Sequence, residues 1–198
     1  MEMKDNLVFY ISGRYEFFNK GVDVFIRALS LLNRRLKEKK FKRSVFVFIM
    51  IPSNSKDPKD SVLESMIQYE RIKDLVEDKF DEVLHDVVGE IVDGKKINFD
   101  QILGKDFYHK IKILSHFFLK YKGKNPPLCA FDLNYDEKDD TIISELKKSD
   151  LTNKEEDRVK VIFYPTYLSP TDGLLGMSYQ DFSIGCSLGV FPSRYEPW

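Results

Sequence analysis

Two short apolar runs near the start of the chain bracket a segment with helical periodicity. Residues 7–12 and 45–51 form these runs, and each ends at a glycine or a proline, which is typical of strands buried on both faces. Between them, apolar residues from Val22 to Leu36 recur every three or four positions and predict an amphipathic helix. Strand, helix and strand in this short stretch favour a right-handed βαβ unit in a parallel sheet.

The middle of the chain predicts a pair of long helices. Residues 53–60 are polar and predict a loop, after which apolar residues recur every three or four positions over 66–87 and again over 107–121. Three glycines are expected to break the helical pattern between these stretches: Gly89, Gly94 and Gly104. We therefore expect a helical hairpin at about residues 61–124.

The charges of the two expected helices are opposite. Residues 61–90 contain nine acidic and three basic residues, whereas residues 104–124 contain one acidic and six basic residues. Helices of opposite charge attract each other, within one chain or between two copies.

The last third of the chain returns to alternating helices and strands. Residues 139–149 predict a short helix, 159–163 a strand, 179–185 a second short helix and 188–191 a final strand. The pattern as a whole predicts an α/β fold with a Rossmann-like parallel sheet, into which the long helical hairpin is inserted.

Composition narrows the class of protein. The 198 residues are 42% hydrophobic and carry a net charge of -1, which indicates a globular protein and gives no general electrostatic reason to bind nucleic acid or a membrane surface. The first residues lack the organisation of a secretory signal, and no apolar stretch is long enough to span a membrane, so we expect a cytoplasmic protein. Cys129 and Cys186 are expected to be free thiols, and no spacing of ligands predicts a metal site.

The loop after the first predicted strand is the first candidate site. In an open α/β sheet, ligands bind beyond the carboxyl ends of the strands, where the following helix presents free N–H groups. Arg14 and Lys20 lie in this loop and could together bind a diphosphate. The alternative is that Arg14 pairs with Glu16 and that Lys20 is solvated.

The last residues, 191–198, are the second candidate site. Glu196 lies there among aromatic residues, in a loop that follows a predicted strand. A carboxylate in this position could accept hydrogen bonds from sugar hydroxyls, while aromatic rings suit the apolar face of a sugar. The alternative is a solvent-exposed glutamate beside aromatic residues that only pack. The apolar, aromatic ending is unusual for a terminus and leads us to expect a chain that continues further.

Together the two segments resemble a known family. Ser12-Gly13-Arg14-Tyr15-Glu16-Phe17-x-Asn19-Lys20-Gly21 and Gly189-Val190-Phe191-Pro192-Ser193-x-Tyr195-Glu196-Pro197-Trp198 are similar to motifs of glycogen synthases of the animal and fungal type. The resemblance implies one half of a GT-B fold. It identifies residues 1–198 as part of the C-terminal nucleotide-sugar-binding domain, with the hairpin as an insertion.

The resemblance also implies an activity and the residues that perform it. The family transfers glucose, with retention, from UDP-glucose to the 4-hydroxyl at a nonreducing end of glycogen, and it uses neither a metal nor another cofactor. Arg14 and Lys20 would bind the diphosphate of UDP and stabilise its developing charge, Tyr179 would stack on uracil, and Glu196 would contact the donor sugar. The catalytic set would be Glu196, Arg14 and Lys20, and the hairpin would assemble a homo-oligomer, a tetramer.

Some positions depart from the family pattern. The family usually has histidine at Ser187, arginine at Ile184 and His-Pro-Glu at 164–166, where this chain has Tyr-Pro-Thr. The chain also ends before the second glutamate of the family motif, so we expect these 198 residues alone to have no polymerising activity. The alternative function is a noncatalytic interaction module that retains the sheet and the hairpin.

Overall fold

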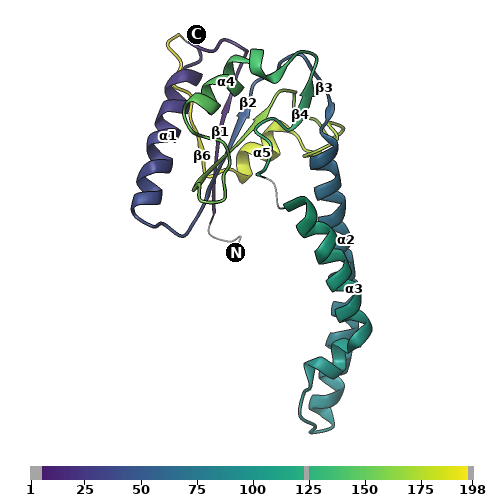
Figure 1. Ribbon diagram of the computed structural model, residues 1–198. Coiled ribbons are helices and arrows are strands. Elements are labelled where there is room, and N and C mark those ends of the chain that lie inside the picture. Colours follow the sequence, from purple (N-terminus) through teal and green to yellow (C-terminus); the bar gives the residue numbers. More distant parts are fainter. Residues whose placement is uncertain (1–5, 123–124, 196–198) are drawn as a thin grey trace. The chain divides into compact units, whose positions relative to one another are not determined.

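The computed structural model describes residues 6–122 and 125–195. The chain divides into two compact units, one formed by residues 1–59 with 125–198 and the other by residues 60–124. The first unit contains the parallel sheet, and the second consists of two long helices (Figure 1).

The parallel sheet of the first unit has the strand order β5-β2-β1-β6. Its strands are β1 (Leu7–Ser12), β2 (Val45–Met50), β5 (Val159–Tyr164) and β6 (Leu188–Gly189), and every neighbouring pair is parallel. Because all four strands run the same way, their carboxyl ends lie at one edge. The α/β fold with a Rossmann-like parallel sheet that the sequence predicts is confirmed, and it agrees with one half of a GT-B fold.

Helices cover both faces of this sheet. Alternate strand residues such as Ile11, Val47 and Val161 pack in one core cluster with α1 (Val22–Glu38) and α4 (Thr141–Lys148). The residues between them, such as Tyr10 and Phe48, pack on the other face with Phe182 of α5 (Tyr179–Gly185). Burial on both faces explains why the strands read as continuous apolar runs in the sequence.

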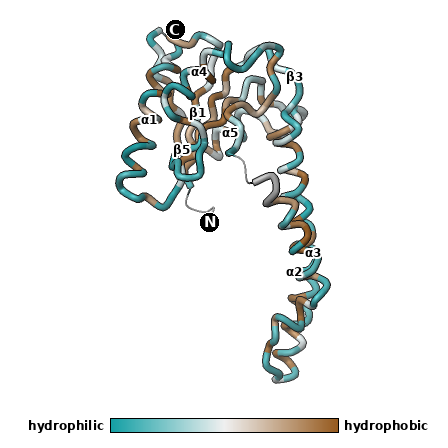
Figure 2. Tube along the Cα trace, viewed as in Figure 1, coloured by the Kyte–Doolittle hydropathy of each residue, from teal (hydrophilic) through white to brown (hydrophobic). Residues whose placement is uncertain are grey.

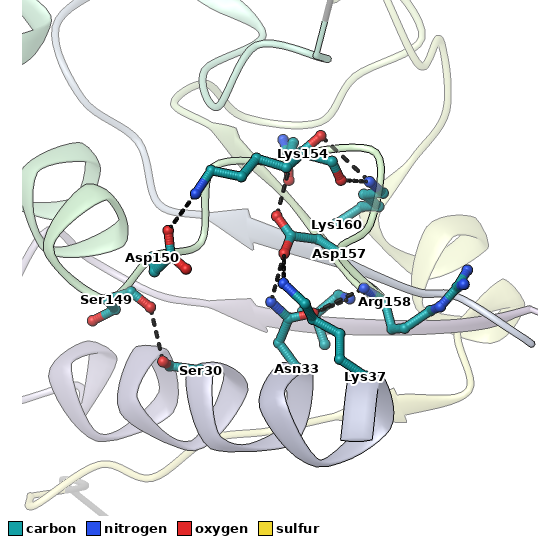
Figure 3. A network of polar contacts seen from close by, with 11 residues as sticks. Ser30, Asn33, Lys37, Ser149, Asp150, Lys154, Asp157, Arg158 and Lys160 are labelled. Atoms are coloured by element: carbon teal, nitrogen blue, oxygen red, sulfur yellow. Dashed lines mark hydrogen bonds and ion pairs between the residues drawn. The ribbon is translucent and has the colours of Figure 1, made fainter. Parts of the chain in front are cut away.

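A buried polar network fixes α1 to the loop before β5 (Figure 3). The side chain of Asp157 is fully buried, and its Oδ1 accepts hydrogen bonds from Asn33 Nδ2 at 2.9 Å and from Lys37 Nζ at 3.2 Å. Asn33 Oδ1 in turn accepts from the backbone N–H groups of Arg158 and Val159. The helix is thereby held against the first residues of β5 by groups that satisfy one another's hydrogen bonds.

The expected loop at residues 53–60 contains a short strand instead. β3 (Ser55–Pro58) pairs antiparallel with β4 (Phe131–Leu133), a second strand that the sequence pattern did not predict. Ser55–Pro58 has no apolar alternation, so its extended conformation comes from pairing with β4 and not from its own composition.

The final strand is shorter than the predicted range of 188–191. Leu188 and Gly189 pair with β1, the N–H of Val190 still donates to the carbonyl of Tyr10, and Pro192 has no N–H to continue the ladder.

The second unit consists of α2 (Asp60–Val92) and α3 (Phe99–Lys122), which pack against each other as the predicted hairpin. Gly89 does not break α2, because one glycine in a long helix costs only about 1 kcal/mol relative to alanine. Gly94 has a φ of 66° in the turn, and Gly104, with a φ of 74° and a ψ of 158°, is non-helical and interrupts α3 at a kink, so the breaks predicted at these two glycines are confirmed.

The hairpin leaves much of its apolar surface exposed. No residue of α2 is buried, and apolar positions alternate with polar ones along the hairpin (Figure 2). Within the described residues, no helix combines the length and the apolarity needed to cross a membrane.

Candidate functional site

A pocket of about 310 Å³ lies at the carboxyl ends of three neighbouring strands. Ser12, Gly13 and Arg14 line it at the end of β1, and Met50 and Pro52 line it at the end of β2. The other lining residues are Thr166, Tyr167 and Leu168, which follow β5, and Tyr179, the first residue of α5. This edge of a parallel sheet is the usual place for a ligand in open α/β folds.

The loop from Gly13 to Gly21 connects β1 with α1 and turns back on itself through backbone hydrogen bonds. The N–H of Gly13 donates to the carbonyl of Met50, the N–H of Glu16 to that of Arg14, and the N–H of Lys20 to that of Glu16. Gly21 precedes α1 with a φ of 67°, a left-handed conformation that glycine adopts without strain. The loop therefore has a defined path from the pocket to the start of the helix.

The two predicted diphosphate-binding side chains are both at this loop, in different surroundings. Arg14 lines the pocket, its side chain is 73% exposed, and it forms an ion pair with Glu16 at 3.1 Å. The alternative that the sequence left open, an Arg14–Glu16 pair, is thus present in this structure. The aliphatic part of Lys20 lies beside Gly13, close enough that a Cβ built on Gly13 would touch Lys20 Cγ at 3.5 Å.

Tyr179, the predicted uracil-stacking residue, lies at the same pocket. Its hydroxyl is 2.9 Å from Ser12 Oγ, and its ring meets the ring of Tyr10 edge to face at a centroid distance of 6.1 Å. The side chain of Tyr179 and, secondly, burial raise the pKa of Tyr10 to about 12, so Tyr10 is neutral at physiological pH. Arg14 and Tyr179, 165 positions apart in the sequence, therefore line one pocket.

The second motif lies against the first. A Cβ built on Gly21 would be 2.1 Å from the carbonyl oxygen of Pro192, so only glycine fits there. The N–H of Arg194 donates to the carbonyl of Asn19 at 2.8 Å, and the guanidinium of Arg194 is 3.4 Å from Asp23 Oδ2. The segment before Glu196 is thus fixed to the loop that carries Arg14 and Lys20. Glu196 itself lies outside the described residues.

The positions that depart from the family pattern have different places. Ile184 is 84% exposed. The hydroxyl of Ser187 accepts from the N–H of Val8, and the N–H of Ser187 donates to the carbonyl of Val8, near the start of β1. Tyr164 is buried at the end of β5, where burial and the nearby Asp172 raise its pKa. Of these positions, Thr166 lines the pocket.

Sequence reasoning missed several pocket residues. Met50, Pro52, Tyr167 and Leu168 were not singled out, and Thr166 was noted only as a departure from the family pattern, although the signal was available. Each follows or ends a predicted strand, and the rule that ligands bind beyond the carboxyl ends applies to every parallel strand and not only to the first.

No cluster of three or more His, Cys, Asp or Glu side chains that could bind a metal ion occurs within residues 6–122 and 125–195. Both cysteines are free, as expected. Burial raises the pKa of Cys129 to about 11, so this thiol is a poor nucleophile at physiological pH.

Comparison with known proteins identifies the family. The family model described as glycogen synthase matches residues 1–198. The chain is 36% identical over 202 residues to the liver glycogen (starch) synthase of Homo sapiens and 33% identical over 216 residues to isoform 2 of Saccharomyces cerevisiae. These alignments cover 100% of this chain but only 28% and 29% of the two relatives. The chain therefore spans less than a third of the length of these relatives, and it belongs to the glycogen synthase family.

Proposed function

We propose that this chain provides the donor-binding part of a retaining glucosyltransferase that transfers glucose from UDP-glucose to the 4-hydroxyl of a nonreducing glucan end. The observation that carries the proposal is the pocket at the carboxyl ends of the strands, which brings together Arg14 of the first motif and Tyr179, a residue 165 positions later in the sequence. The names of the relatives, glycogen (starch) synthases, agree with a glucan as the acceptor.

The pocket offers each part of a nucleoside diphosphate a chemically suitable partner. A tyrosine ring, Tyr179, can stack on the base, and the guanidinium of Arg14 can bind phosphoryl oxygens with two parallel hydrogen bonds. Because Arg14 pairs with Glu16 in this structure, binding would exchange a partly exposed carboxylate partner for the diphosphate. Exposed ion pairs contribute only about 0–1 kcal/mol, so this exchange costs little.

The departing UDP gains negative charge as the bond to glucose breaks. Without a metal, cationic side chains must stabilise that charge, and we assign this role to Arg14 and Lys20. Glu196 would contact the donor sugar, at the end of the segment that Pro192 and Arg194 fix to the loop. Metal independence stays a prediction, as does the cytoplasmic location.

A noncatalytic module is the less supported alternative. The family match extends over every residue of the chain, and the pocket keeps the Arg14 and Tyr179 side chains that a donor would contact. We nevertheless expect these 198 residues alone to be inactive as a polymerase, because a GT-B active site is built between two halves.

We further propose that the hairpin of α2 and α3 binds a second copy of the chain. Large apolar side chains of α2 are exposed, among them Phe80 at 64% and Leu84 at 55%, and the two helices carry opposite net charges. Apolar helix faces of this kind are covered in stable assemblies.

UDP binding to the full chain, measured by calorimetry, tests the proposed function. Arg14→Ala and Lys20→Ala should each raise the dissociation constant about tenfold, as expected for the loss of a charge-assisted hydrogen bond. Arg34→Ala is the matched control, because it removes the same charge from an exposed position three turns along α1 and should leave the affinity unchanged. Binding that withstands EDTA supports metal independence. The proposal is wrong if the unsubstituted chain does not bind UDP, or if all three variants bind it equally well.

A further inference from the structure

The side chain of Tyr15 ties the loop that carries Arg14 and Glu16 to a buried carboxylate. The Tyr15 hydroxyl donates a hydrogen bond of 2.7 Å to Oδ2 of Asp140, which lies 125 positions away in the sequence at the start of α4. The ring of Tyr15 also packs against the core between the sheet and α1. Tyr15 therefore points into the protein, while the side chain of its neighbour Arg14 is 73% exposed at the pocket.

Asp140 is itself rigidly held. It is 1% exposed, and its Oδ1 caps α4 by accepting from the N–H of Ile143 at 2.9 Å. Its Oδ2 accepts a second hydrogen bond of 2.7 Å, from the hydroxyl of Tyr135, and that hydroxyl also lies 2.7 Å from Ser53 Oγ. A buried carboxylate with three donors is a fixed point, because moving it would leave buried groups without partners.

We propose that Tyr15 is a positioning residue for donor binding: its hydrogen bond to Asp140 anchors the β1–α1 loop, which carries Arg14 and Lys20, beside the pocket before the donor arrives. This inference rests on the proposed function. Burial, and next the bond to Asp140, raise the pKa of Tyr15, so its hydroxyl remains a donor throughout the physiological range. A preformed loop lowers the cost of ordering two cationic side chains on binding.

Two phenylalanine variants of the full chain separate positioning from stability. Tyr15→Phe and Tyr135→Phe each remove one hydroxyl from the same oxygen of Asp140, and both should lower the melting temperature by several degrees. Only Tyr15→Phe releases the donor loop. It should raise the dissociation constant of UDP about fivefold to tenfold, whereas Tyr135→Phe should change it less than twofold.

Hydrogen exchange of the loop amides gives a second readout that needs no ligand. Tyr15→Phe should accelerate exchange over residues 14–20 by at least about fivefold relative to Tyr135→Phe. In an Asp140→Ala background, no side-chain atom is left at position 140 to bond the tyrosine hydroxyl, so Tyr15→Phe should add no further acceleration if the two groups act as a pair.

The outcomes are decisive in both directions. Equal loop exchange and equal UDP affinity in Tyr15→Phe and Tyr135→Phe would overturn the positioning role, and so would a full additional effect of Tyr15→Phe in the Asp140→Ala background. If the unsubstituted chain does not bind UDP, the proposed function fails, while loop exchange still decides whether Tyr15 anchors the loop.

Discussion

Cys129 shows how strongly the core controls a single side chain. It is fully buried at the point where the chain bridges to Phe163, and burial raises the pKa of its thiol to about 11. Only the thiolate reacts with alkylating agents, so the neutral thiol is unreactive well above physiological pH.

Alkylation of Cys129 should therefore be slow in the folded protein. We expect iodoacetamide to label Cys129 at least about tenfold more slowly than Cys186, because the Cys129 sulfur is fully buried and its thiolate is scarce, whereas Cys186 is partly exposed. Peptide mapping by mass spectrometry after timed labelling measures both cysteines in the same sample, and the chain unfolded in urea is the control, in which both should react alike. Equal labelling rates in the folded protein would show that the core does not protect the Cys129 thiol.

Gly21 lies where the β1–α1 loop, the start of α1 and the segment at Pro192 come together. Its φ of 67° lets the loop enter α1, and the missing side chain lets the carbonyl of Pro192 approach the helix start. The two sequence motifs therefore come into contact only because position 21 has no side chain: the carbonyl of Pro192 occupies the space that a Cβ would fill.

Gly21→Ala should lower the free energy of unfolding by at least about 2 kcal/mol, because a side chain at this φ is strained and its Cβ would overlap Pro192. Urea unfolding followed by circular dichroism measures the change. Gly185→Ala, in α5, is the matched control, since a Cβ there meets no atom within 4 Å, and it should be close to neutral. Similar stabilities for the two variants would mean that Pro192 is not in contact with Gly21 in solution.

The helices and strands that were predicted correctly are those whose own residues show an apolar pattern. β1, β2 and α1 have continuous or periodic apolar patterns because each packs against the core. β3 was missed because its conformation depends on pairing with β4, over 70 positions away. Local pattern contains no information on such a partner.

The candidate site was predictable in part for the same reason. Arg14 and Tyr179 were identified through the family resemblance, and the rule that ligands bind beyond the carboxyl ends of parallel strands placed Arg14 correctly at the end of β1. The bond between Tyr15 and Asp140 could not be predicted, since a tyrosine in a loop and an aspartate before a helix each have ordinary local explanations. Only the path of the chain brings them together.

At the scale of the whole molecule, the apolar side chains of α2 remain exposed, because the fold of one chain does not bury any of its residues. Phe80 and Leu84 lie one helical turn apart on α2, and both are more than half exposed. Two copies could cover these side chains and pair the acidic helix with the basic one.

Phe80→Ala combined with Leu84→Ala should shift sedimentation equilibrium of the chain toward the monomer mass at physiological salt, because the contact would lose its central apolar area. Glu77→Ala combined with Asp81→Ala is the matched control on the same turns, and it should cause a smaller loss that disappears at high salt. A monomeric unsubstituted chain at all salt concentrations would exclude self-association through the hairpin.

The pairing of β3 with β4 has a consequence for how this family can change over time. Pro58 lies opposite Phe131, so the chain leaves the sheet unit and returns to it at adjacent backbone positions. The excursion itself is the helical unit of residues 60–124, whereas Cys129 already belongs to the core of the sheet unit. Every strand and every residue that lines the pocket lies outside residues 60–124, so this segment can be lengthened or shortened without removing any of them. The length of the hairpin and the content of the donor pocket are therefore encoded in separate parts of the sequence.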